Sequence, residues 1–199
     1  MADDGILTGT EVRQKLLAGA VKLTDAVSCT LGPRGQNVIL YQKGADPVIT
    51  KDGVTVARVV ELEDDFEQAG VEVLRQAALQ TNTVAGDGTT TSTVLAKAIL
   101  EEANRQITAG AIPIEVKRGM DKAVEKIIDK LNEMSKPVSS EEDISHVATV
   151  SANGDKVIGK LIASAVAAAG KDGAITIEES RSLETSLDVE EGFQFDSGY

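Results

Sequence analysis

The segment with the strongest chemical character is Gly86-Asp87-Gly88, which is followed by an unbroken run of hydroxyl residues, Thr89 to Thr93. Glycine tolerates positive φ and has no Cβ, so its backbone N–H groups can turn toward a ligand at close range. The amphipathic residues after this run predict a helix whose unpaired N–H groups and positive dipole end lie at the loop. Such an arrangement favours an anion, and phosphate is the usual one.

Asp87 indicates a second component of this site. A carboxylate repels a bare phosphate, so its presence suggests a hard cation between the two, with Mg²⁺ as the best match. The segment is not a Walker motif, because no Gly-Lys-Ser/Thr follows. The structural alternative is a glycine-rich turn whose aspartate and threonines cap a helix. Short glycine motifs often occur by chance, so this motif alone leaves both interpretations open.

Two further loops contain glycine and lie between regular elements, where binding residues are often found. The first runs from Thr30 to Gly35, and the second, Lys51 to Gly53, makes a tight turn into Val54–Ala57. With the Gly86–Thr91 loop, they supply backbone amides, a lysine, carboxylates and hydroxyls, which suffice to bind a nucleotide phosphate with Mg²⁺. Asp52 is the candidate for orienting an attacking water, and a plain turn residue is an equally good interpretation of it.

Composition excludes several classes of function. The 199 residues are 42% hydrophobic and carry a formal charge of −12, which argues against a nucleic-acid partner. The single Cys29 excludes an intrachain disulfide, and its apolar surroundings predict a buried, inert thiol. The single His146 excludes a histidine-cluster metal site and a Ser-His-Asp triad. Without a leader pattern or a long apolar run, the chain is expected to be soluble and cytoplasmic, with no membrane association.

Apolar residues at three- to four-residue spacing predict helices, and alternating segments bounded by glycine or proline predict strands. The predicted elements of the first part are a helix from about Thr8 to Cys29, a hairpin of Asn37–Tyr41 and Pro47–Thr50, a helix from the acidic cluster Glu61–Glu67 to about Val84, a helix from the hydroxyl run to about Ile107, and a helix from Pro113 to about Met134. We interpret the acidic cluster as solvated capping residues and not as a metal site, since acids are favourable at helix N-termini. Met120 and Met134 belong to the apolar stripe of the last helix and are expected in the core.

A shift in composition places a domain boundary near residues 135–140. Ser139 with Glu142, and Ser140 with Asp143, resemble capping boxes and predict a helix there. A second helix is predicted from Asp155 to Ala169, with Val157, Leu161, Ile162 and Ala165 facing inward. Three strands are predicted after it: Ala174–Ile177, Leu187–Glu190 and Phe193–Phe195. The predicted fold class is therefore mostly α with small β elements (α+β).

Three segments, Thr30–Val38, Ile49–Ala57 and Ala85–Ala96, closely resemble the group I chaperonins, the GroEL type of bacteria. The resemblance runs from the first helix to the last residue and includes Val150–Asn153 and Glu191–Asp196. Three separate motifs in the right order and spacing make it far more specific than any one glycine motif.

The resemblance implies an architecture and partners. Residues 1–135 resemble the N-terminal half of the helical equatorial ATP-binding domain, residues 136–190 the N-terminal part of the intermediate domain, and residues 191–199 the start of the apical domain. Members of this family are homo-oligomers, double seven-membered rings that hydrolyse ATP to enclose non-native proteins with a lid co-chaperonin. The strands around Asn37–Thr50 would reach into the neighbouring subunit.

The resemblance also implies roles for individual residues. Thr30, Leu31, Gly32 and Pro33 would line the nucleotide pocket, Lys51 would lie at the phosphates of ATP, and Gly88, Thr89, Thr90 and Thr91 would cradle them. Asp87 would hold Mg²⁺. A K⁺ ion would be bound by backbone oxygens of Thr30 and Lys51 and by the hydroxyl of Thr90. Asp52 would assist hydrolysis from the side of the attacking water.

Two departures from the family pattern matter. Family chains are more than twice as long, so this chain is expected to be an N-terminal fragment that lacks the principal catalytic aspartate and the nucleotide-base contacts. Ser197 stands where the family commonly has arginine, which puts an inter-subunit charge contact in doubt. Two alternative functions remain: a free 199-residue polypeptide with weak or no nucleotide binding, and an unrelated small phosphotransferase built on the Gly-Asp-Gly loop.

Overall fold

The structure is a computed structural model that describes residues 5–41, 44, 46–170, 173–178, 185–190 and 192. Over these residues the chain is mostly helical with a small two-stranded sheet, which confirms the predicted fold class. The chain divides into two compact units, residues 1–133 and residues 134–199. Each unit has helices of its own.

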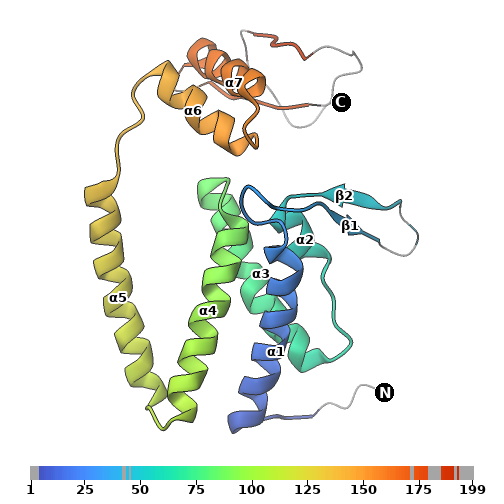
Figure 1. Ribbon diagram of the computed structural model, residues 1–199, viewed down its shortest axis with the longest axis vertical. Coiled ribbons are helices and arrows are strands. Elements are labelled where there is room, and N and C mark those ends of the chain that lie inside the picture. Colours follow the sequence, from blue (N-terminus) through green and yellow to red (C-terminus); the bar gives the residue numbers. More distant parts are fainter. Residues whose placement is uncertain are drawn as a thin grey trace. The chain divides into compact units, whose positions relative to one another are not determined.

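The first unit contains the three glycine-bearing loops and the helices that carry them (Figure 1). Its elements are α1 (Gly9–Ser28), β1 (Val38–Leu40), β2 (Val48–Thr50), α2 (Gly53–Val59), α3 (Asp65–Ala85), α4 (Thr89–Thr108) and α5 (Pro113–Met134). The predicted long helices and the hairpin are confirmed, and β1 pairs antiparallel with β2 so that Ile39 lies opposite Ile49. The stretch Val54–Ala57 after the tight turn lies in the short helix α2.

The core of this unit forms where α1, α2 and α3 pack together, with α4 against α1 and α3 (Figure 1). Small aliphatic side chains fill it, as expected for a chain without tryptophan. The buried cluster consists of Ala20, Leu23, Val27, Val56, Ala57, Val71 and Leu74. Because these residues come from three helices, burying them fixes the three helices against one another.

A pair of glycines allows α1 and α3 to approach until their backbones touch. A Cβ on Gly19 of α1 would lie 1.8 Å from the carbonyl oxygen of Glu67, and a Cβ on Gly70 of α3 would lie 2.1 Å from that of Leu16. Any side chain at either position would have to displace backbone atoms of the other helix. The contact is therefore reciprocal and has no room for a methyl group.

Charged groups beside this contact also join α1 to α3. Lys15 Nζ lies 2.5 Å from an oxygen of Asp64 and 3.4 Å from one of Glu67, and Lys22 pairs with Glu67 as well. Asp64 is also the N-cap of α3, accepting hydrogen bonds from the amides of Phe66 and Glu67, which confirms a capping role in the acidic cluster. Hydrogen bonds from Lys15 and Lys22 lower the pKa of Asp64 and of Glu67, respectively.

The prediction of a buried Cys29 is wrong, because its side chain is exposed. The buried face of α1 carries Ala20, Leu23, Thr24 and Val27, and Cys29 follows Val27 by two residues, which places it on a different side of the helix. Cys29 is the C-cap residue of α1, and its Sγ donates to the carbonyl of Ala26 at 3.0 Å.

The prediction that Met120 and Met134 lie in the core is also wrong. No residue of α5 is buried, and 66% of Met134 is exposed. The helix and its apolar stripe are present as predicted, but a stripe becomes core only where another element packs closely along it, and none of the described helices does so here.

The second unit is built on two packed helices, α6 (Glu141–Ser151) and α7 (Lys156–Ala169). Ser140 and Asp143 form the predicted capping box of α6, and Asp155 caps α7 by accepting from the amides of Val157 and Ile158. The helices pack closely at Gly159, where a Cβ would lie 2.0 Å from Thr149 Oγ1.

Two predictions for this unit are wrong. Val157 does not face inward, since 76% of it is exposed, and the buried residues of α7 are Gly159, Ala163 and Ala165. The segments Ala174–Ile177 and Leu187–Glu190 are not strands, because an alternating segment needs a paired neighbour and the described residues provide none. The third predicted strand, Phe193–Phe195, lies outside the described residues, as does Ser197.

Among the helices that the structure describes, none combines the length and the apolar character that crossing a membrane would require.

Candidate functional site

The structure brings the three glycine-bearing loops together around Thr90, the second residue of α4. The hydroxyl of Thr30, at the end of α1, lies 3.1 Å from the hydroxyl of Thr90, although 60 residues separate them in the chain. Gly53, the first residue of α2, lies against the same hydroxyl: a Cβ at Gly53 would be 2.2 Å from Thr90 Oγ1. Three loops predicted separately from the sequence therefore share one contact point.

The direction of the Thr30–Thr90 hydrogen bond follows from its neighbours. Thr30 Oγ1 donates to the carbonyl of Val27 at 2.8 Å. A hydroxyl has one proton to donate and two lone pairs, so Thr30 must accept from Thr90. Thr90 then donates its hydroxyl proton to Thr30, and the lone pairs of Thr90 Oγ1 remain available to bind a cation.

The start of α4 has the backbone geometry expected for an anion-binding helix N-terminus. Gly86 closes α3 with φ +72°, and Gly88 precedes α4 with φ +82°, both in the left-handed region that favours glycine. Gly88 has no side chain to cap α4, whereas Asp52 caps α2 and Asp64 caps α3. The N-cap residue of α4 therefore provides no side-chain hydrogen bond to the first N–H groups of the helix.

The hydroxyl residues of this run divide into two groups. Thr89 is 7% exposed and Thr93 is fully buried, and Thr93 Oγ1 donates to the carbonyl of Thr89 at 2.9 Å. Thr89 could therefore reach a phosphate only through its backbone N–H. Thr91 is exposed, and Thr90 and Ser92 are half-buried, with Ser92 Oγ donating to the carbonyl of Thr89 at 2.9 Å. The accessible hydroxyls of this run are therefore those of Thr90, Thr91 and Ser92.

Asp52 has a clear structural role as the N-cap of α2. One carboxylate oxygen accepts from the amide of Val54 at 3.2 Å, and the other accepts from the amide and the hydroxyl of Thr55 at 3.0 and 2.6 Å. The backbone N–H of Asp52 donates to the hydroxyl of Thr50 at 3.0 Å. Asp52 thus has a structural role as a helix cap and not as a plain turn residue, and its exposed position leaves it accessible to a ligand as well.

Asp87 and Lys51 are both exposed. An oxygen of Asp87 accepts from the amide of Gly88 at 2.6 Å, which orients the carboxylate beside the start of α4. Within the described ranges, no group of three or more His, Cys, Asp or Glu residues could hold a metal ion. The single carboxylate of Asp87 fits Mg²⁺ bound together with a nucleotide, because Mg²⁺ commonly takes one or two carboxylates and completes its shell with phosphate oxygens and water.

The loop after α1 is held in shape by its own backbone. The amide of Gly35 donates to the carbonyl of Gly32 at 2.9 Å, and the amide of Gln36 donates to that of Cys29 at 2.8 Å. Leu31, Gly32 and Pro33 are exposed on this loop. They lie next to Thr30 in the chain, and Thr30 is the residue of this loop that contacts α4.

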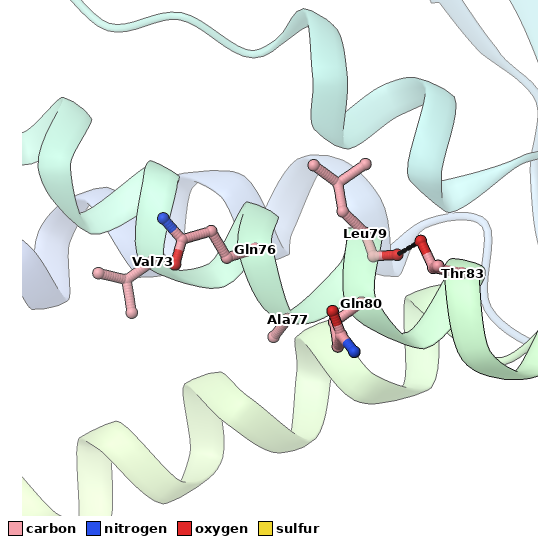
Figure 2. A pocket seen from close by; sticks show the side chains of 6 residues that line it. All are labelled: Val73, Gln76, Ala77, Leu79, Gln80 and Thr83. Carbon is pink, nitrogen blue, oxygen red and sulfur yellow. Dashed lines mark hydrogen bonds between the residues drawn. The ribbon is translucent and has the colours of Figure 1, made fainter.

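The candidate residues lie apart from a surface hollow on α3, which is lined by Val73, Gln76, Ala77, Leu79, Gln80 and Thr83 (Figure 2). None of these side chains is charged, and Thr83 donates its hydroxyl proton to the carbonyl of Leu79. The hollow has no charged group to bind a phosphate or a metal and includes none of the predicted site residues, so the loops remain the candidate site.

Thr50 and Thr55 were not predicted as site residues, although both form hydrogen bonds with Asp52. Asp52 itself carried a usable signal, because an aspartate directly before a helix is a favoured N-cap residue. Gly53 was predicted only as a turn residue, whereas the structure needs glycine there to leave room for Thr90.

A sequence model of the TCP-1/cpn60 chaperonin family matches residues 23–199. The chain therefore belongs to the TCP-1/cpn60 chaperonin family. Chaperonins assist protein folding, are generally ATPases, and generally form oligomeric rings that bind substrate proteins. Membership gives this chain a role in chaperonin-assisted folding and removes the unrelated phosphotransferase from consideration.

Proposed function

We propose that this chain is a subunit of a group I, GroEL-type chaperonin whose three glycine-bearing loops bind Mg·ATP. The observation that supports this most directly is the 3.1 Å contact between Thr30 and Thr90, with Gly53 beside it. In the assembled protein, a double seven-membered ring with a lid co-chaperonin, hydrolysis of the nucleotide would drive the enclosure and folding of non-native proteins in the cytoplasm.

In this proposal each part of the site has one task. The N–H groups at the start of α4, with Gly88, Thr89, Thr90 and Thr91, hold the phosphates, and Lys51 adds positive charge. Asp87 holds Mg²⁺, which neutralises phosphate charge when it is bound. K⁺ is held by the lone pairs of Thr90 with backbone oxygens of Thr30 and Lys51. Leu31, Gly32 and Pro33 border the nucleotide, and Asp52 faces the attacking water.

The same proposal assigns domains. Residues 1–135 belong to the equatorial ATP-binding domain, residues 136–190 to the intermediate domain, and residues 191–199 to the start of the apical domain. The packing of α1 to α4 around the three loops suits a nucleotide-binding domain, because loops that bind ligands need rigid elements on either side.

The alternative is that the 199-residue polypeptide, by itself, is non-catalytic and binds nucleotide weakly or not at all. Two observations favour it: no residue of α5 is buried, and Leu31, Lys51, Asp52 and Asp87 lie at an open surface. An open surface gives a ligand little buried area, and water weakens the attraction between charges there.

Calorimetric titration of the 199-residue chain with ATP tests the proposal, with Mg²⁺ present or removed by chelation. We expect Mg²⁺ to strengthen binding and Asp87→Asn to weaken Mg·ATP binding by at least about tenfold, the loss typical when a metal site is damaged. Asp129→Asn is the matched control, since Asp129 is an exposed acid on α5. An ATP affinity that changes neither on removal of Mg²⁺ nor with Asp87→Asn would contradict the proposal. No ATP binding by the unchanged chain would favour the alternative.

A further inference from the structure

One stripe of α3 carries polar side chains that hold the segment between α2 and α3. Gln68, Glu72 and Arg75 follow one another at four and three residues, so they share a face of the helix. Gln68 accepts from the amide of Leu62 at 2.9 Å and donates to Glu72 at 2.7 Å. Arg75 donates to the same oxygen of Glu72. The three side chains form one connected hydrogen-bond chain.

Arg75 ends this chain on the C-terminus of α2. Its Nε donates to the carbonyl of Ala57 at 2.9 Å, and one terminal nitrogen donates to the carbonyl of Val60. Only 15% of its side chain is exposed. The last carbonyls of a helix lack intrahelical partners and carry its negative dipole end, so a guanidinium is well suited to hold them. The rigid fork of arginine lets one side chain bind both carbonyls and Glu72.

The helix that Arg75 holds is the one that carries the second loop of the candidate site. α2 has seven residues, too few to be stable as an isolated helix, so its place depends on contacts with its surroundings. Its N-terminal end, Asp52 and Gly53, lies at the contact with Thr90. Because α2 is so short, fixing the position of its C-terminal end also restricts the position of its N-terminal end.

We propose that Arg75 is a positioning residue of the candidate site: by holding the C-terminal end of α2, it fixes where the Lys51–Gly53 turn lies against Thr90. The identity of the ligand rests on the proposed function, whereas the mechanical role of Arg75 does not. The role is distinct from general stabilisation, because the hydrogen bonds that Arg75 makes outside its own helix are with Ala57 of α2 and with Val60, the residue that ends α2.

Two measurements on the full 199-residue chain test this. Amide hydrogen exchange without nucleotide should show that Arg75→Met raises exchange at the α2 amides by about tenfold, the effect of losing hydrogen bonds to a charged group. Glu72→Ala, which removes only the acceptor that orients Arg75, should also raise exchange at the α2 amides, but by less. The matched control is Lys22→Met, which breaks an ion pair between α1 and α3 and should leave exchange in α2 unchanged.

The second measurement is a double-mutant cycle for Mg·ATP affinity. If Arg75 acts by placing the Lys51 turn, Arg75→Met weakens binding about tenfold in the unchanged chain but has little further effect in a Lys51→Met background, because contacting or coupled groups are not additive. Simple additivity, or unchanged α2 exchange in both Arg75→Met and Glu72→Ala, would overturn the inference. Failure of the unchanged chain to bind Mg·ATP would count against the proposed function alone, since the exchange measurement still decides the role of Arg75.

Discussion

Helices α3 and α5 are nearly equal in length, 21 and 22 residues, and both are amphipathic, yet only one contributes to a core. In α3, Val71, Leu74 and Ala78 are fully or almost fully buried against the neighbouring helices. In α5, Ile127 is 57% exposed and Leu131 is 58% exposed, and no residue is buried.

The difference lies in what surrounds each helix and not in its pattern. α3 meets α1 at two glycines, so the two backbones touch and the apolar stripes between them are sealed from water. α5 also contains a glycine, Gly119, but a Cβ built there would meet no atom within 4 Å. An apolar stripe therefore predicts which side of a helix can be buried, and only a close neighbour makes that side a core.

The largest effect should come from adding one methyl group to each of these glycines. Gly70→Ala should destabilise the α1–α3 contact by at least about 4 kcal/mol, an exceptional value, because the methyl group overlaps the backbone oxygen of Leu16. Gly119→Ala should instead stabilise the chain by about 0.5–1 kcal/mol, because alanine favours a helix and meets nothing there. Urea unfolding followed by circular dichroism measures both; equal effects would mean that α1 and α3 do not touch as described.

Truncation of one leucine in each helix should give a smaller contrast. Leu74→Ala should cost about 3 kcal/mol, because Leu74 is 1% exposed and its removal leaves a cavity among packed side chains. Leu131→Ala should change stability by less than about 0.5 kcal/mol, as for other exposed positions. The same urea titrations compare the two variants. A large loss for Leu131→Ala would show that α5 is covered by a partner in solution.

The sequence predicted the long helices well because their ends carry local signals, but it did not predict the seven-residue α2. The Ser140–Asp143 capping box, the acids before α3 and Pro113 at the start of α5 each act within one helical turn, so the order of residues is enough to locate them. The hairpin of β1 and β2 was predicted for the same reason, because its two strands are close together in the sequence. Cys29 was placed wrongly because, two residues after the buried Val27, it lies on another side of the helix, and Val157 because the buried face of α7 carries Gly159, Ala163 and Ala165 instead.

The candidate site was predictable only in part. The residues of the three loops could be picked out one loop at a time, but nothing local shows that Thr30 and Thr90 meet across 60 residues; the family resemblance supplied that expectation. The segments Ala174–Ile177 and Leu187–Glu190 illustrate the same limit, since a strand is defined by a partner that its own alternation does not specify. The hydrogen bonds from Arg75 to α2 were not predicted because their acceptors are backbone carbonyls, which every residue has and which the sequence therefore cannot single out.

The smallest contrast between α3 and α5 should appear in their response to acid. The pKa values of Asp64 and Glu67 are lowered from ordinary values of 3.8 and 4.5, chiefly by hydrogen bonds from Lys15 and Lys22 of α1. Groups with a lowered pKa stabilise the folded state above their ordinary values, and this contribution is lost as pH falls through the lowered values. Protection of α3 amides from hydrogen exchange should therefore hold down to about pH 5 and decline below about pH 4.

The double variant Asp64→Asn/Glu67→Gln keeps a residue that can cap α3 but has no carboxylate at either position to titrate. Protection of its α3 amides should be lower at neutral pH and should change less as the pH falls. The ion pair Lys117–Asp121 of α5 is more than half exposed on both sides and joins no second helix, so its removal by Asp121→Asn should leave the acid response of α3 unchanged. An acid decline of the same steepness in the double variant would show that the Lys15 and Lys22 pairs do not hold α1 to α3.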